Sequence, residues 1–137
     1  ATTADSFAAL SERVETEGLV AWTEIEHLLA SDWEGPAGEV TRRLMAATPG
    51  FGSGGTSADA WAQQISKTFT EMVVARPTPG GVRMIPGLFS WAMVIAFGKR
   101  LRATPNGRRA GTPVSHGPNP APRFNGESQA AQRNWCE

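Results

Sequence analysis

The stretch from Leu88 to Phe97 constrains the fold of this chain more than any other feature. Its ten residues are almost all apolar, and Gly87 and Gly98 bound it. A short apolar run of this kind is typical of a strand that is buried on both faces. Because a lone strand leaves its backbone edges without partners, the fold or a second protomer must supply neighbours. We therefore expect a buried strand at 88–97 and, to cover it, a homo-oligomer.

Ahead of this run, capping residues and apolar spacing predict three short helices. Asp5 or Ser6 is placed to cap a helix over residues 6–16, and Thr23 with Glu26 has capping-box spacing for a helix over 23–31. Pro36 suits the first turn of the third helix. The apolar side chains expected to face the core recur at helical spacing, and they are Phe7, Leu10, Val14, Val40 and Leu44.

A fourth helix has the strongest periodic signal. It should begin near residue 58, after a glycine-rich loop over 48–57, and end before Pro77 and Pro79. Its apolar stripe predicts a buried helix face, made of Trp61, Ile65, Phe69, Met72 and Val73.

These elements predict an α+β chain that is mostly helical, with residues 1–97 as a body and residues 98–137 as an extended arm rich in Pro and Gly. Asn106 and Gly107 suit a tight turn in the arm. The body carries six basic and eleven acidic side chains, whereas the arm carries seven and two. A cationic arm suits an acidic surface or a polyanion. The arm has no aromatic residue before Phe124, which argues against stacking on nucleic acid bases.

Several classes of protein are disfavoured by the sequence. No apolar run is long enough for a membrane span and no signal peptide is recognisable, so we expect a cytoplasmic protein without membrane contact. The single cysteine, Cys136, allows no internal disulfide. With only His27 and His116 beside it, no zinc-type ligand set can be assembled, and we expect neither a metal nor a cofactor.

The arm begins with GKRLRATPNGRRAGTPVSHGPNP, Gly98 to Pro120, which resembles the ATPDGRKAG-type signature of the glycyl radical enzymes. This is the longest and most specific of the motifs that resemble the family. Further segments resemble it in the same order along the chain, and they are Ala4 to Ala9, Trp22 to Ile25, Phe51 to Ser53 with Asp59, and Pro86 to Ser90.

The resemblance implies part of a ten-stranded α/β barrel. In that family one loop carries a cysteine that becomes a thiyl radical, and another carries the glycine that stores the radical after activation by an iron-sulfur, S-adenosylmethionine enzyme. This chain resembles the stretch between the two loops. Asn106 replaces the usual Asp, His116 stands near another usual Asp, and no RVAGY-like motif occurs. We expect no catalytic residue here, because Cys136 lies at the wrong end of the segment.

Two groups of residues are candidate binding sites. Phe89, Ser90 and Trp91 are pocket candidates, because the resemblance places their segment at the barrel interior, although core packing is the competing interpretation. Arg108 and Arg109 follow the Asn-Gly turn and could present guanidinium groups to an anion. Structural pairing with acidic neighbours is the alternative. His116 and Cys136 are more simply a solvated histidine and an inert thiol.

The sequence therefore predicts a partial or repurposed segment of a glycyl radical enzyme barrel that is not catalytically competent alone. Its partners would be the remaining parts of such an enzyme. Two alternatives stay open: a homo-oligomeric module that binds a small molecule or a partner, and a weak nucleic-acid binder that uses the basic arm. Affinity that falls steeply with salt would favour the latter.

Overall fold

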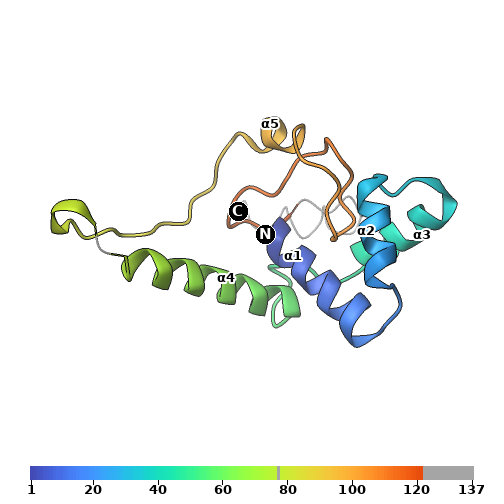
Figure 1. Cartoon of the computed structure of the whole chain (residues 1–137), viewed down its shortest axis with the longest axis horizontal. Coiled ribbons are helices and arrows are strands. Elements are labelled where there is room, and N and C mark those ends of the chain that lie inside the picture. Colours follow the sequence, from blue (N-terminus) through green and yellow to red (C-terminus); the bar gives the residue numbers. More distant parts are fainter. Residues whose placement is uncertain (77, 122–137) are drawn as a thin grey trace, which may run out of the picture.

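The computed structural model describes residues 1–76 and 78–121, and this part of the chain is mostly helical (Figure 1). No strand occurs in it; an isolated bridge joins Thr104 to Arg108. In chain order the elements are α1 (Thr2–Ala9), the π-helix η1 (Leu10–Thr16), α2 (Trp22–Ala30), α3 (Gly35–Ala46), α4 (Ser57–Val74), the 3-10 helix η2 (Pro79–Gly81) and α5 (Val94–Gly98).

The four predicted helices are confirmed in position. The helix expected over 6–16 begins earlier, at Thr2, and changes from α1 to η1 at Leu10. The capping box predicted from Thr23 and Glu26 is wrong, because α2 starts at Trp22 without a side-chain cap. A capping box is present instead at α4, where Thr56 accepts from the Asp59 amide at 3.2 Å and the Asp59 carboxylate accepts from the Thr56 amide at 3.0 Å.

The core lies where α1, η1, α2 and α3 meet. Trp33 and Met45 are its largest fully buried side chains, and Ala9, Val14, Val20, Ile25 and Leu28 complete the cluster. Trp33 sits in the connection between α2 and α3, with a positive φ of 62°. A β-carbon at Gly38 would lie 2.6 Å from the Trp33 carbonyl oxygen, so the glycine lets α3 approach this connection.

The predicted buried strand at 88–97 is not formed. Residues 82–91 adopt no regular secondary structure, and the end of the run folds into α5. Phe89 and Trp91 are 66% and 52% exposed, whereas Val94 is buried. A strand needs a neighbour for its ladder, and the described residues contain no second strand to provide one.

Helix burial also differs from the prediction. α4 packs its first turns on α1, where Trp61 stacks on Phe7 with ring centroids 4.9 Å apart, and then runs beyond the body (Figure 1). Phe69 and Met72 are therefore 45% and 57% exposed. Val40, expected to face inward, is 68% exposed.

The described part of the arm returns to the body. The predicted Asn106-Gly107 turn is confirmed: the Gly107 amide donates to the Thr104 carbonyl at 3.1 Å, and the Thr104 amide donates to the Arg108 carbonyl at 3.0 Å. Gly107 has a φ of +80°, which a side chain would disfavour. No helix in the described part of the chain is long and apolar enough to cross a membrane.

Candidate functional site

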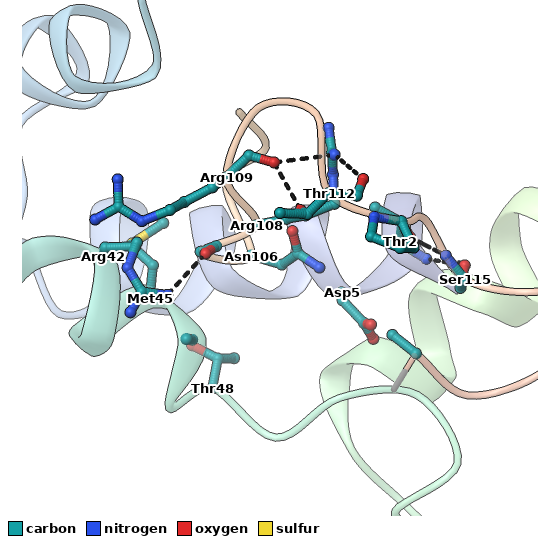
Figure 2. Close-up of a pocket in the computed structure, with 14 residues that line it drawn as sticks. Thr2, Asp5, Arg42, Met45, Thr48, Asn106, Arg108, Arg109, Thr112 and Ser115 are labelled. Atoms are coloured by element: carbon teal, nitrogen blue, oxygen red, sulfur yellow. Dashed lines mark hydrogen bonds between the residues drawn. The ribbon is translucent and has the colours of Figure 1, made fainter. Parts of the chain in front are cut away.

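A cavity of about 420 Å³ lies between α1, α3 and the returning arm (Figure 2). We call it the polar cavity, because most of the side chains drawn around it carry oxygen or nitrogen. The residues that line it are Thr2, Asp5, Arg42, Met45, Ala46, Thr48, Asn106, Gly107, Arg108, Arg109, Thr112, Pro113, Ser115 and Ala121. It contains both arginines of the predicted anion site and neither aromatic residue of the predicted pocket.

The wall formed by residues 104–112, here called the arginine loop, is tied to α3 and to the turn before it. Arg42 donates to the Gly107 carbonyl at 3.1 Å, and Arg109 donates to the Asp32 carbonyl at 3.0 Å. The Ala110 amide donates to the Asp32 carboxylate at 2.6 Å. The buried Trp33 indole donates to the Arg108 carbonyl at 3.3 Å. These bonds join segments that are far apart in sequence and fix the loop's position.

Glu39 is the centre of the ion pairs at this junction. Its carboxylate lies 2.8 Å from guanidinium nitrogens of Arg42, Arg43 and Arg109. Hydrogen bonds from Arg42, then from Arg43 and from Arg109, hold the pKa of Glu39 well below its usual range. The same carboxylate raises the pKa of Arg42. Because the Glu39 side chain is only 29% exposed, this cluster is better shielded than the Lys67–Glu71 pair on α4.

Arg108 turns its guanidinium group back into the arginine loop. It donates to the carbonyl oxygens of Thr112 at 2.7 Å and Arg109 at 3.1 Å, to the Thr104 hydroxyl at 3.2 Å, and to the Arg102 carbonyl. Burial lowers its pKa, against the opposing charge of Asp32. Arg109 is paired with the acidic Glu39, which is the structural pairing considered from the sequence. Arg108 instead donates mainly to backbone carbonyls. Anion binding by either residue stays a prediction.

The opposite wall of the polar cavity comes from α1. The predicted cap at Asp5 or Ser6 is wrong, because α1 starts at Thr2 and both residues lie inside the helix. The Thr2 amide and hydroxyl donate to the Ser115 hydroxyl at 2.9 and 3.0 Å, and the Ser115 amide donates to the Thr2 hydroxyl at 3.0 Å. Asp5, only 4% exposed, accepts from the Phe51 amide at 2.7 Å. Asp5 could have been found from the sequence, because an acidic residue on the inner face of an amphipathic helix needs a hydrogen-bond partner when it is buried.

The aromatic candidates lie elsewhere. Phe89 borders a second, mainly apolar cavity of about 720 Å³ between α4 and the start of α1. Trp91 stands 5.8 Å from Phe89 and 6.4 Å from Phe97 between ring centroids. Ser90 lies between them and is exposed. Their role as a substrate pocket stays a prediction.

Among the residues that the structure describes, the remaining chemistry-bearing side chains provide no second site. His27 and His116 are both exposed. Within residues 1–76 and 78–121, no three His, Cys, Asp or Glu side chains are grouped so that they could hold a metal ion. Cys136, Phe124 and Trp135 lie outside the described residues.

Comparisons with known proteins show which family this helical segment and its arginine loop belong to. The family model described as "Pyruvate formate lyase-like" matches residues 1–98. The chain therefore belongs to the pyruvate formate lyase-like family of glycyl radical enzymes. The predicted resemblance is confirmed.

Two relatives show how much of such an enzyme the chain corresponds to. It is 27% identical over 124 residues to "Probable dehydratase YbiW" of Escherichia coli (strain K12), covering 85% of this chain and 15% of the relative. It also matches the glycerol-bound B12-independent glycerol dehydratase from Clostridium butyricum with a TM-score of 0.79 and 28% identity, over 88% of this chain and 15% of that one. The chain thus spans about 15% of the length of either relative.

Proposed function

We propose that this chain acts as a wall segment of a glycyl radical enzyme barrel and does not run radical chemistry alone. The observation that carries the proposal is the extent of the match: nearly nine-tenths of the chain adopts the shape of one part of a glycerol dehydratase. The chemistry of a complete enzyme would be cleavage of a C–C, C–N or C–O bond begun by hydrogen-atom abstraction. A cytoplasmic location is part of the same proposal.

The internal contacts support a structural role. The guanidinium groups of Arg42, Arg108 and Arg109 donate to backbone carbonyls, to a hydroxyl and to Glu39. These bonds hold the arginine loop rigid. A rigid loop is what an active-site wall requires, because catalytic geometry tolerates only small displacements. In this proposal Phe89, Ser90 and Trp91 would border the interior that the complete barrel encloses.

The absence of the radical-bearing motifs from the sequence supports the second half of the proposal. The sequence has one cysteine, Cys136, and no RVAGY-like glycine motif. A thiyl radical and a glycyl radical would both have to come from other segments of the enzyme. The partners would then be the remaining parts of a glycyl radical enzyme.

Electron paramagnetic resonance tests this directly. The chain is incubated without oxygen with an activating enzyme and S-adenosylmethionine, and the Clostridium butyricum glycerol dehydratase is treated in parallel as the positive control. We expect the organic radical doublet in the control and no such signal in this chain. A glycyl doublet that arises from this chain would overturn the proposal.

A further inference from the structure

Residues 113–118, here called the partition, border both cavities. Pro113 and Ser115 line the polar cavity, and Gly117 and Pro118 line the second, mainly apolar cavity. Among the described residues, no helix or strand includes any part of the partition. Its place in the fold therefore depends on the few contacts that its residues make with neighbouring elements.

On one side the partition is bonded to the start of α1. The Thr2 hydroxyl donates to the Ser115 hydroxyl at 3.0 Å and accepts from the Ser115 amide at 3.0 Å. The Thr2 amide also donates to the Ser115 hydroxyl, at 2.9 Å (Figure 2). Ser115 is only 9% exposed, so the loss of a partner would leave a buried polar group unsatisfied. We call Thr2 and Ser115 the hydroxyl pair.

On the other side the partition contacts the segment that carries the aromatic candidates. The Val114 amide donates to the Val94 carbonyl at 3.4 Å. A β-carbon at Gly117 would lie 2.4 Å from the Phe89 carbonyl oxygen, so the two backbones approach closely at this glycine. Trp91 lies between these two contact points in the sequence. The partition therefore holds both ends of the stretch that contains Trp91.

We propose that Ser115 is a positioning residue, which sets through the partition where Phe89, Ser90 and Trp91 lie relative to α1. This role rests on the proposed function, in which these three residues border the interior of a complete barrel. Ser115 would not touch a bound substrate; its hydroxyl would determine how the wall presents the aromatic side chains to that interior. The partition, α1 and the aromatic segment all belong to this chain, so the role is the same whatever further segments complete the enzyme.

Fluorine NMR of the full chain, labelled with fluorotryptophan, tests this role. The chain has five tryptophans, and Trp91→Phe identifies the Trp91 resonance. Ser115→Ala and Thr2→Val each remove one hydroxyl of the pair. Each should shift the Trp91 resonance by more than its linewidth and leave the resonance of the fully buried Trp33 in place. Thr2→Ser keeps the hydroxyl, so it should retain the Trp91 resonance of the unaltered chain.

Two further variants calibrate the measurement. Gly117→Ala places a β-carbon against the Phe89 carbonyl and should also shift the Trp91 resonance, which shows that the signal responds to the partition. Ser31→Ala is the matched control, because the Ser31 hydroxyl donates to the Leu28 carbonyl at 3.2 Å at the end of α2. It should leave the Trp91 resonance in place.

A Trp91 resonance that stays in place in either hydroxyl variant, or that Thr2→Ser displaces as far, would overturn the positioning role. So would a Trp33 resonance that shifts together with it, because the hydroxyl pair would then stabilise the body as a whole. A Trp91 resonance that already has the position of the urea-unfolded chain in the unaltered protein would also overturn it. None of these outcomes depends on radical chemistry, which electron paramagnetic resonance tests separately, so failure of the positioning role and failure of the proposed function can be told apart.

Discussion

Replacement of Gly107 by alanine should release the arginine loop from α3. Gly107 has a φ of +80°, and a β-carbon there would lie 2.7 Å from the Arg42 carbonyl oxygen and 2.7 Å from the Ala46 β-carbon. The left-handed conformation costs an alanine roughly 1–2 kcal/mol. The forced shift of the loop against a helix backbone adds about 1–3 kcal/mol. We therefore expect Gly107→Ala to destabilise the chain by about 3 kcal/mol.

Gly111→Ala is the matched control. Gly111 has a φ of +73°, but nothing lies within 4 Å of a β-carbon built there, so only the conformational cost of about 1–2 kcal/mol applies. For 137 residues, 1 kcal/mol corresponds to a shift in Tm of about 3–4 °C. Thermal unfolding followed by circular dichroism should show a loss of about 10 °C for Gly107→Ala and about half that or less for Gly111→Ala. Hydrogen exchange should rise at the Ala110 amide mainly in the first variant. Equal losses in the two variants would refute the close packing of Gly107 on α3.

Three further substitutions test separate contacts. The pKa of Glu39 is lowered in the folded state, so Glu39 stabilises the fold above its unfolded pKa of about 4.3, and this stabilisation is lost as the pH falls. Urea unfolding between pH 6 and pH 3 should therefore show a weaker acid dependence of stability for Glu39→Gln than for the unaltered chain. Trp33→Ala should destabilise by about 3–5 kcal/mol because Trp33 is fully buried, whereas Trp22→Ala should change the urea midpoint little, and equal effects would contradict the location of the core. Thr56→Ala should weaken the start of α4 by about 1 kcal/mol, seen as faster amide exchange at Asp59, and unchanged exchange would argue against the cap.

The helices could be predicted because local residues define them. Gly18, the glycine-rich loop at 48–57 and Pro77 mark three of the places where the helical pattern stops. The buried face of α3 could not be predicted from local residues. Gly38, Thr41 and Met45 face inward, since Gly38 allows the close approach to Trp33, and so the more apolar Val40 is left outside. Hydrophobicity alone placed Val40 wrongly, whereas Leu44 does pack against the core.

The strand and the α4 stripe were mispredicted for one shared reason. Their apolar patterns are suited to burial, but burial requires neighbours that the described residues do not contain. Part of the site could be predicted from the sequence, namely the turn at Asn106 and Gly107 and the arginines after it. Glu39 and Asp32, which hold Arg109, lie 70 and 77 residues away, and no local signal links them.

The most direct test of the account is a chimera in which the matched segment of the Clostridium butyricum glycerol dehydratase is replaced by residues 4–121 of this chain. Because the two segments share their shape, the chimera should fold and give a glycyl radical doublet after anaerobic activation, whereas this chain alone gives none. A chimera with Gly107→Ala should lose soluble protein or radical yield, because the wall is distorted. A chimera that fails to fold or gives no radical, or a radical on this chain alone, would contradict its role as a wall segment of a glycyl radical enzyme.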